Sequence, residues 1–389
     1  MKRTPFLLAM MAAAVMPQWA AHAQSKPPVK IGYISILTGP LAGYGKAQEL
    51  MVKLAVEDVN AKGGINGSLL QVDSVDATID PGQAVVMFRK FLGEGHFGVI
   101  GPMTGTQWET VSALANQLNM PAITATASKP GITIRPWTIR MQPPDDIYIG
   151  EGFASFAKLY PNIKNVVITA DVREASGKAG AEAFEALAKK SGWKVLGVAE
   201  FSTRATDLSP VAIQIKGLNP DAVLVSALGP NALQLAKEFK TQNVTVPVLA
   251  NSLIWPGPFV NTVGDAGRNW HTIGFTTPTS STGDNTLNLS AVKRFQERAD
   301  ASLGKPANSA NWSLSYDTVL AYADMMRSAK IDGNTDPKVA REAIKNEFMK
   351  IKTFKGIQSY VMRDTGDMHI PGRALVADTT KNEWRFADK

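Results

Sequence analysis

Small polar residues that follow a short apolar run have the chemistry to bind a carboxylate. Thr104-Gly105-Thr106-Gln107 lies between FGVIG at 97–101 and a segment with helical spacing. Gly105 allows the backbone to approach a ligand closely, and the flanking hydroxyls can donate hydrogen bonds. The first N–H groups of a helix are unpaired and attract anions. The same loop also fits an ordinary N-cap in which Thr106 bonds its own helix, and the two interpretations are compatible.

Two further candidates are expected beside this loop. Ala127-Ser128 follows the apolar run PAITAT at 121–126, and Tyr44 begins a helical segment after the run VKIGYISI at 29–36. The carboxyl ends of parallel strands meet at one edge of a sheet, which is where ligands bind in open α/β folds. We therefore expect Tyr44, Ala127 and Ser128 to share a rim with the Thr104–Gln107 loop.

The chain offers little for catalysis. It contains no cysteine and four histidines, which excludes disulfides, zinc–thiolate sites, Fe–S clusters and a cysteine nucleophile. G-x-x-x-x-G-K-[ST], G-x-S-x-G and H-E-x-x-H do not occur. The G-x-G-x-x-G match at 93–98 precedes a strand-like run, so it cannot present a helix N-terminus to a dinucleotide. We interpret Asp145-Asp146, after two prolines, as a helix cap rather than an acid–base pair. No enzymatic activity, cofactor or metal is expected.

The first 23 residues are typical of a secretory signal peptide. A short basic start at Lys2-Arg3 precedes the apolar run 6–15 and the cleavage signature Ala21-His22-Ala23. Acylation of a bacterial lipoprotein requires a cysteine at the cleavage site, and the chain has none. We expect cleavage after Ala23 and release into the periplasm without a lipid anchor.

Composition and charge are those of a soluble globular protein. Of the 389 residues, 44% are hydrophobic and 19% are charged, and the length suggests two to three domains. The formal charge of +7 comes from 41 basic and 34 acidic residues, and the basic residues are scattered among acids. No basic stripe with interleaved aromatic residues is present, so we expect no binding to nucleic acid.

Strand-like runs alternate with segments of helical period along most of the chain. The runs lie at 29–36, 69–76, 97–101, 121–126, 165–171, 193–201, 222–227 and 247–251, and the helical segments at 44–62, from Pro81, and at 106–118, 175–190, 208–218 and 230–242. This alternation predicts βαβ units and parallel sheets, an α/β fold. Segments 97–126 and 221–251 share one order of strand, small-residue loop, helix, proline and strand. They indicate either coincidence within generic α/β sequence or two lobes of similar build that face each other across a cleft.

Three groups of residues carry a family resemblance. They are IGYISILTGPLAGYGK with AVEDVNAKGGINGSLLQV (31–46, 55–72), FGVIGPMTGTQ with PAITATASKP (97–107, 121–130), and WSLSYDTVLAYADMMRSA with FKGIQSYVMRDTGDMHI (312–329, 354–370). These resemble the periplasmic solute-binding proteins of ABC importers, of the leucine/isoleucine/valine-binding (branched-chain amino acid) type. The resemblance implies the type I periplasmic binding protein fold, with two Rossmann-like lobes, a ligand cleft between them and three chain crossings. Lobe 1 would be 27–142 plus 275–370, and lobe 2 would be 143–274 plus 371–389.

The resemblance also implies a function. The protein would capture a small carboxylate-bearing solute by lobe closure, act as a monomer, and deliver the solute to a membrane permease. A periplasmic sensor that presents its solute to a signalling receptor is the alternative, because it would have the same fold and site. An exported enzyme would need a nucleophile–base pair, for which the histidines are badly placed.

The family's site residues are matched only in part. In its amino-acid binders, the loop matching Thr104–Gln107 and the segment matching Ala127-Ser128 hold the ligand carboxylate, and a tyrosine near Tyr44 packs on the ligand. In lobe 2, Ser176 stands where the family often has a tyrosine. The family places an acid after the strand matching PVLAN at 247–251, whereas this chain has none until Asp265.

The missing acid leaves the class of ligand open. A buried ammonium without a carboxylate partner is costly, which favours an ammonium-free aromatic or aliphatic acid. Tyr148 and Trp255 could then stack on a ring, and Arg173 could pair with a second anionic group; Trp108 fits a core position better than a ligand wall. If Asp171 or Glu174 replaces the missing acid, an amino acid is favoured instead.

Overall fold

The computed structural model describes residues 26–254, 259–274, 276–277, 280–281, 290, 293–294, 297–298, 301 and 313–387. The predicted signal peptide at 1–23 lies outside these residues. Among the residues that the structure describes, no helix combines the length and apolar character needed to cross a membrane.

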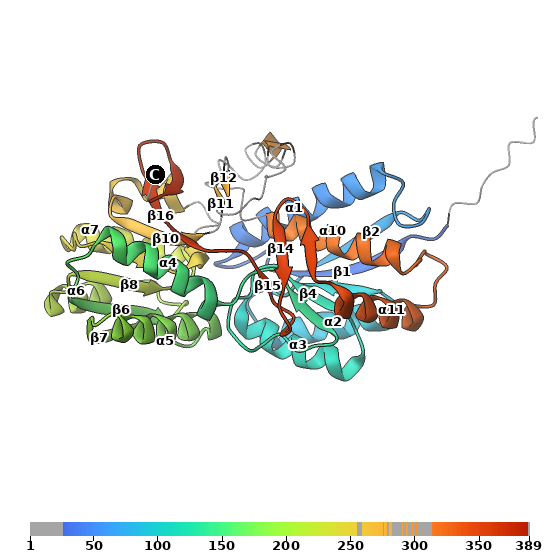
Figure 1. Ribbon diagram of the computed structural model, residues 1–389, viewed down its shortest axis with the longest axis horizontal. Helices are drawn as coiled ribbons and strands as arrows, with labels where there is room; N and C mark the ends of the chain where they lie inside the picture. Colours follow the sequence, from blue (N-terminus) through green and yellow to red (C-terminus); the bar gives the residue numbers. More distant parts are fainter. Residues whose placement is uncertain are drawn as a thin grey trace, which may run out of the picture.

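Two groups of elements lie side by side along the long axis of the molecule (Figure 1). The first group holds β1 (Val29–Ser35), α1 (Ala42–Ala61), β2 (Leu70–Asp76), α2 (Pro81–Gly93), β3 (Gly98–Ile100), α3 (Gly105–Leu118), β4 (Ala122–Thr124), β5 (Thr138–Arg140), α10 (Ser313–Ser328), α11 (Pro337–Lys350), β13 (Thr353–Lys355), β14 (Ser359–Met362) and β15 (Met368–His369). β1 to β5 form a parallel sheet in the order β2-β1-β3-β4-β5, and β13 to β15 form a small antiparallel sheet.

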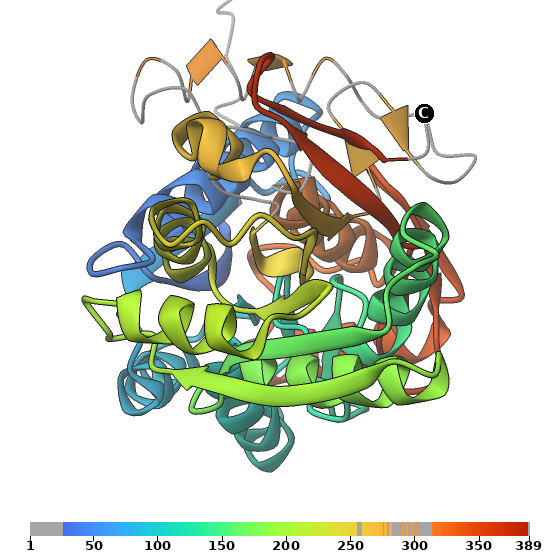
Figure 2. The ribbon, with the colours of Figure 1, turned by 90° about the vertical axis from the view of Figure 1, so that its left-hand side faces the viewer.

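The second group holds α4 (Asp145–Leu159), β6 (Asn165–Asp171), α5 (Ala175–Lys190), β7 (Lys194–Phe201), α6 (Ser209–Leu218), β8 (Ala222–Ser226), α7 (Gly229–Thr241), β9 (Val248–Ala250), η1 (Ser252–Ile254), α8 (Phe259–Thr262), η2 (Gly264–Gly267), β10 (Trp270–Gly274), β16 (Arg373–Asp378) and β17 (Glu383–Phe386). Its sheet has the order β17-β16-β10-β9-β8-β6-β7, in which β16 and β17 run antiparallel to their neighbours. β11 (Thr276–Thr277) and β12 (Ser280–Ser281) pair separately. The end-on view shows this second group in front of the first (Figure 2).

The two parallel cores repeat one topology. β2-β1-β3-β4-β5 and β7-β6-β8-β9-β10 follow the same path from strand to strand. The similar segments 97–126 and 221–251 become β3-α3-β4 and β8-α7-β9, which occupy equivalent places in the two sheets. The sequence pattern therefore marks a repeated α/β build rather than a coincidence.

Continuous apolar burial holds each sheet between its helices. All five residues of β8 are buried, which is the pattern of a strand covered on both faces. In the first group, α1 buries Met51, Leu54 and Ala55 and packs against α10. The chain passes from the first group to the second between β5 and α4, and again between β15 and β16. Both passages bring the groups together at the carboxyl ends of their parallel strands.

Candidate ligand-binding site

The repeated strand order determines where a ligand can bind. In an open sheet of this order, the connections leave in opposite directions from two neighbouring strands, and a crevice opens beyond their carboxyl ends. These strands are β1 and β3 in the first group, and β6 and β8 in the second. The loops that follow them should therefore face one another across the junction of the two groups.

A cavity lies at this junction and is lined by those loops. It encloses about 530 Å³ of space that protein atoms do not fill, part of it open to solvent. The first group contributes Leu41, Tyr44, Gln48, Met103, Thr104, Gly105, Thr126 and Gln142, and the second contributes Glu174, Ser176, Leu228, Gly229, Ser252 and Leu253. The cavity thus has walls from the loops that follow β1, β3, β4 and β5 in the first group and β6, β8 and β9 in the second.

The loop between β3 and α3 meets the second group at very short range. Thr104 is the N-cap of α3, and its Oγ1 accepts a hydrogen bond of 3.4 Å from the backbone N–H of Gln107. A Cβ at Gly105 would lie 2.2 Å from Ser176 Oγ, so only glycine permits this approach. The helix N-terminus predicted to attract an anion therefore reaches the cavity wall.

Glu174 links two helices at the floor of the cavity. As N-cap of α5, it accepts a 2.8 Å hydrogen bond from the N–H of Gly177 through Oε2. Its other oxygen, Oε1, lies 3.4 Å from both the backbone nitrogen and the hydroxyl of Thr106, at the start of α3. Burial raises the pKa of Glu174, while the hydrogen bonds from backbone N–H groups oppose this shift. The residue brings a carboxylate to the site from a position that the family pattern does not use.

Ser176 offers an unused hydrogen-bonding group. It lies in the first turn of α5, is 2% exposed, and its hydroxyl has no hydrogen-bond partner within the described part of the protein. A buried polar group without a partner costs free energy. A solute that bonds this hydroxyl would recover that cost.

The remaining walls are largely apolar. Tyr44, on α1, reaches across the junction, since a Cβ at Gly229 would lie 1.4 Å from its hydroxyl oxygen. Burial raises the pKa of Tyr44, so the phenol stays neutral. An apolar cluster spans both groups and contains Ile36, Leu41, Leu228, Met103 and Leu253. These surfaces suit an aliphatic or aromatic part of a solute.

Four of the predicted site residues line the cavity: Tyr44, Thr104, Gly105 and Ser176. Thr106 and Arg173 line an adjoining hollow that shares Thr104 and Glu174 with the cavity. Gln107 is buried, and its amide bonds the backbone oxygen of Thr78 at 3.0 Å. Trp255 lies outside the described residues.

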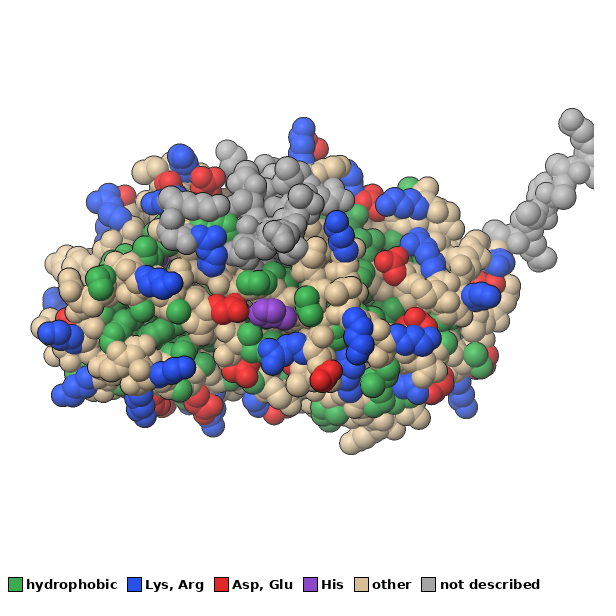
Figure 3. All heavy atoms as spheres, viewed as in Figure 1, with side chains coloured by type: hydrophobic (Ala, Val, Ile, Leu, Met, Phe, Trp, Pro, Cys, Tyr) green, Lys and Arg blue, Asp and Glu red, His purple; other side chains and the backbone are tan. Residues whose placement is uncertain are grey.

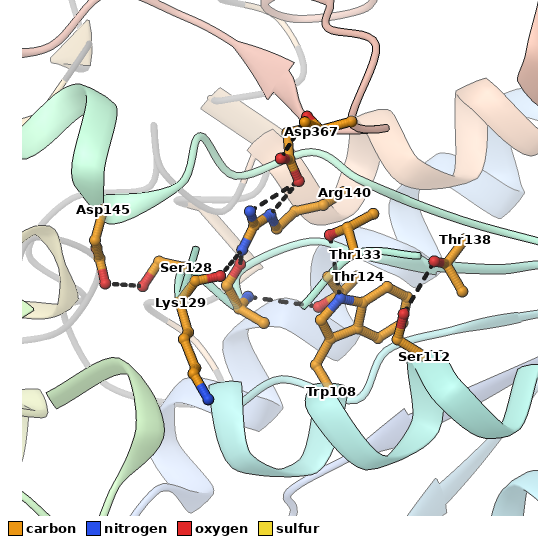
Figure 4. Close-up of polar contacts among 12 residues, drawn as sticks. Trp108, Ser112, Thr124, Ser128, Lys129, Thr133, Thr138, Arg140, Asp145 and Asp367 are labelled. Carbon is orange, nitrogen blue, oxygen red and sulfur yellow. Dashed lines mark hydrogen bonds and ion pairs between the residues drawn. The ribbon is translucent and has the colours of Figure 1, made fainter. Parts of the chain in front are cut away.

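Ala127, Ser128 and Tyr148 are buried away from the cavity lining. Figure 4 shows the guanidinium of Arg140 reaching the loop that carries two of them. It bonds the backbone oxygens of Ala127 at 3.2 Å and Lys129 at 2.6 Å, and it pairs with Asp367. Ser128 Oγ donates to Asp145 Oδ2 at 3.0 Å, within the protein. These residues hold the loop in place behind the site.

The structure places Asp145-Asp146 and Trp108 in positions that decide how the sequence was interpreted there. Asp145 and Asp146 begin α4, but neither caps it. The N-cap is Pro144, and the oxygens of Asp145 accept hydrogen bonds from hydroxyl groups, so the cap assignment was wrong. Trp108 is fully buried in the core, as the sequence favoured.

The site residues that the sequence did not identify belong to loops after other strands of the same edge. Gln142 follows β5, Leu228 and Gly229 follow β8, and Ser252 and Leu253 follow β9. The rule that parallel strands end at one edge applies to these loops too. Which of their side chains face the cavity depends on how the two groups meet.

The described part of the chain holds no group of three or more His, Asp or Glu side chains arranged to bind a metal. Gly93 ends α2 and Gly98 starts β3, so the G-x-G-x-x-G match does not open a helix. On the face shown in Figure 3, basic and acidic side chains are interspersed.

Known proteins resemble this chain in sequence. The profile described as periplasmic binding protein matches residues 28–380. The Leu/Ile/Val-binding protein of Escherichia coli (strain K12) is 34% identical over 107 residues, 28% of this chain and 29% of that protein. The Leu/Ile/Val-binding protein BraC3 of Rhizobium johnstonii is 33% identical over 174 residues, 44% of this chain and 46% of that protein. The matched segments therefore span less than half the length of these relatives.

Solved structures resemble the chain over most of its length. A leucine-binding protein from Thermotoga maritima has a TM-score of 0.78 at 19% identity, covering 92% of this chain and 97% of that one. A branched-chain amino acid transporter substrate-binding protein from Streptococcus pneumoniae, in complex with isoleucine, has 0.77 at 20%, covering 92% and 98%. An ABC transporter solute-binding protein from R. palustris, in complex with benzoate, has 0.78 at 17%, covering 92% and 95%. At these identities the likeness establishes the fold.

Proposed function

Because this chain belongs to the periplasmic binding protein family and has its type I fold, we propose that it is the solute-binding component of an ABC importer. It captures a small carboxylate-bearing solute between two lobes and delivers it to a membrane permease, without chemistry on the solute. Lobe 1 is 27–142 plus 275–370 and lobe 2 is 143–274 plus 371–389. The division of the strands between two sheets supports these limits.

The observation that carries the proposal is the cavity between the two groups of elements. Both sheets direct the loops after their parallel strands into it, and Ser176 presents a buried hydroxyl without a partner. A cavity with walls from both halves suits capture by closure, because a solute gains all its contacts only when both halves touch it.

The solute carboxylate belongs at the start of α3. The helix N-terminus favours negative charge, Gly105 permits close approach, and the Ser176 hydroxyl can donate a hydrogen bond from the other side. Three to five hydrogen bonds, each worth roughly 1.5–3 kcal/mol to a charged group, support about micromolar affinity after ordering costs.

Glu174 favours an α-amino acid among the carboxylate-bearing solutes. It is the one charged side chain among the described lining residues. A carboxylate there can pair with a ligand ammonium, which supplies the acid that the sequence lacks after PVLAN. The apolar walls formed by Leu41, Leu228 and their neighbours suit an aliphatic side chain. The relatives named for leucine, isoleucine and valine support this choice, whereas the benzoate complex supports an aromatic acid as the second candidate.

The place of action that we propose is the periplasm. The signal-peptide pattern at 1–23 and the family of the chain support export.

A thermal-shift screen tests the function. The protein of residues 24–389, stripped of bound solute by partial unfolding and refolding, is mixed with L-leucine, L-isoleucine, L-valine, 4-methylpentanoate and benzoate. A ligand at a hundred times its Kd adds about 2.7 kcal/mol, which shifts Tm by a few degrees. We expect the amino acids to raise Tm. A rise with the ammonium-free acids alone would favour the second candidate, and no rise with any carboxylate would contradict the proposed function.

A further inference from the structure

A chain of buried hydrogen bonds leads from the cavity wall into the protein. Gln142 and Ser252 line the cavity, and Gln142 Nε2 donates to Ser252 Oγ at 3.3 Å. Ser252 Oγ is hydrogen-bonded to the hydroxyl of Tyr148, which lies 2.5 Å from Asp145 Oδ1. Ser128 Oγ donates to the other oxygen of Asp145, as Figure 4 shows. Asp145, Tyr148 and Ser128 are fully buried, so the chain ends at a carboxyl without access to solvent.

The ionised form of Asp145 fixes the direction of every bond in this chain. A carboxylate only accepts hydrogen bonds, so Tyr148 and Ser128 must donate to it. Tyr148 has then used its single proton, and it accepts one from Ser252. The amide nitrogen of Gln142 only donates, so Ser252 accepts there. The Ser252 hydroxyl therefore has no proton left, and it can offer a ligand only a lone pair.

The protonated form of Asp145 permits the reverse direction. A neutral carboxyl has one O–H that can donate toward Tyr148. Tyr148 can then donate to Ser252, and the Ser252 proton is free to turn into the cavity. The same serine thus presents an acceptor in one state and a donor in the other.

We infer that Asp145 is a positioning residue that sets the hydrogen-bonding character of the cavity through Tyr148 and Ser252. With Asp145 ionised, Ser252 selects a solute group that donates, such as an ammonium. With Asp145 protonated, Ser252 accommodates a group that accepts, such as a carboxylate. The inference rests on the proposed function, because it takes this cavity to be the solute site. We call the hydrogen-bonded series Asp145–Tyr148–Ser252 the relay.

The surroundings of Asp145 allow both forms near neutral pH. Burial raises its pKa to about 7, against the lowering effect of the hydrogen bonds from Tyr148 and Ser128. Two charged groups act on it from neighbouring elements: Arg140 favours the ionised form and Glu174 disfavours it. Arg140 is itself paired with Asp367, and Asp146 next to it is exposed.

The test interrupts the relay and leaves the carboxyl groups of Asp145 and Glu174 unchanged. Tyr148→Phe removes the hydroxyl that joins Asp145 to Ser252. Tyr160→Phe is the matched control, since its hydroxyl bonds His271 and does not line the cavity. Affinities for L-leucine and for 4-methylpentanoate, which has the same shape without the ammonium, are measured by calorimetry at pH 5.5 and 8.5.

We expect the preference for L-leucine over 4-methylpentanoate to increase from pH 5.5 to 8.5 in the wild type and in Tyr160→Phe. In Tyr148→Phe this increase should be smaller by about tenfold, the value of one hydrogen bond to a charged group. Glu174 is present in all three proteins, so its own titration does not alter the comparison. An equal increase in all three proteins would overturn the inference.

A second measurement needs no ligand. The carboxyl carbon of Asp145, assigned in ¹³C-aspartate-labelled protein by comparison with Asp145→Asn, should titrate near pH 7, and its midpoint should rise in Tyr148→Phe. A midpoint near 4, the ordinary value for aspartate, would overturn the relay. If neither probe binds while Asp145 titrates near 7, the proposal of a leucine-like solute fails and the relay's titration stands.

Discussion

Among single residues, Glu174 is the one charged side chain in the described lining of the cavity. It brings a carboxylate to a cavity whose other described lining residues are neutral, and it does so as the N-cap of α5. In family amino-acid binders the acid follows a different strand, so motif matching alone points to an ammonium-free ligand. The position of Glu174 points the other way, because it caps the helix that follows β6 and lines the cavity at that end of the strand.

Replacing Glu174 tests this assignment. In Glu174→Gln the ammonium of L-leucine loses its charged partner, so we expect its Kd to rise at least about tenfold, while binding of 4-methylpentanoate is unchanged or tighter. Calorimetry measures both, and Glu182→Gln, at an exposed position on the same helix, is the control. Equal weakening for both ligands would argue against an ammonium partner.

Ser176 provides a second test at this scale. We expect Ser176→Ala to weaken solute binding by about 1 kcal/mol, because the hydroxyl has no other hydrogen-bond partner within the described part of the protein. Tm of the ligand-free protein should not fall, since no internal bond is lost. Ser191→Ala, at the exposed end of α5, should bind like the wild type. Unchanged affinity in Ser176→Ala would remove this serine from the site.

At the scale of elements, the starts of α3 and α5 meet across the junction. Thr106 Oγ1 accepts a 3.1 Å hydrogen bond from the backbone N–H of Ala175 and lies beside Glu174. Thr106 Oγ1 and the Glu174 carboxylate therefore accept hydrogen bonds from backbone N–H groups in the first turns of both helices. Their contact can only exist when the two groups are close together, so it should contribute to closure.

Thr106→Ala removes that contact. We expect solute binding to weaken by about 1 kcal/mol through a less favourable closed form, with Tm of the ligand-free protein changed by less than a degree or so. Thr110→Ala, one turn further along α3 and exposed, controls for the loss of a threonine hydroxyl. A fall in stability without a change in affinity would mean that Thr106 serves folding rather than closure.

The sequence predicted the regular βαβ units well. The helix predicted at 175–190 is observed at Ala175–Lys190, and the one at 106–118 begins one residue earlier. These units combine buried apolar strands with amphipathic helices, so their periods are clear. β5 has only three residues, with no apolar run of its own, and was not predicted. A helix was expected to start at Asp145-Asp146, where α4 begins, but its length was not predicted. The antiparallel pair β16–β17 went unpredicted, because its place follows from contacts between distant segments.

The sequence predicted only part of the site, because it indicates which loops lie at the sheet edge but not where their side chains point. Tyr44, Thr104, Gly105 and Ser176 follow strands whose loops the sequence marks with small residues. Ser128 and Tyr148 follow the same logic but hydrogen-bond to Asp145 within the protein. The direction of a loop side chain depends on the neighbouring lobe, which local pattern does not encode.

At the scale of the whole molecule, buried carboxyls should shape stability. Burial raises the pKa values of Asp145 and Asp317 to about 7, and that of Glu174 also increases. Their unfolded values lie near 4, so the folded state holds more protons between about pH 4 and 7. The corresponding stability is present at the acid end of this window and is lost as pH rises through it.

We therefore expect Tm of the ligand-free protein to decrease from pH 5 to pH 8. In Asp145→Asn the neutral amide cannot ionise, so the decrease should be smaller by about 5 °C. Differential scanning calorimetry across this range measures both slopes. A Tm that increases with pH, or equal slopes in the two proteins, would contradict the assigned effect of burial on Asp145.

If two lobes close on a bound solute, the whole molecule becomes more compact, and small-angle X-ray scattering measures this change. Ligand-stripped protein is measured alone and with the carboxylate solute that raises Tm most, L-leucine being the one expected. We expect a smaller radius of gyration on saturation, because both lobes must contact the solute at once. A solute that raises Tm but leaves the scattering curve unchanged would contradict capture by closure.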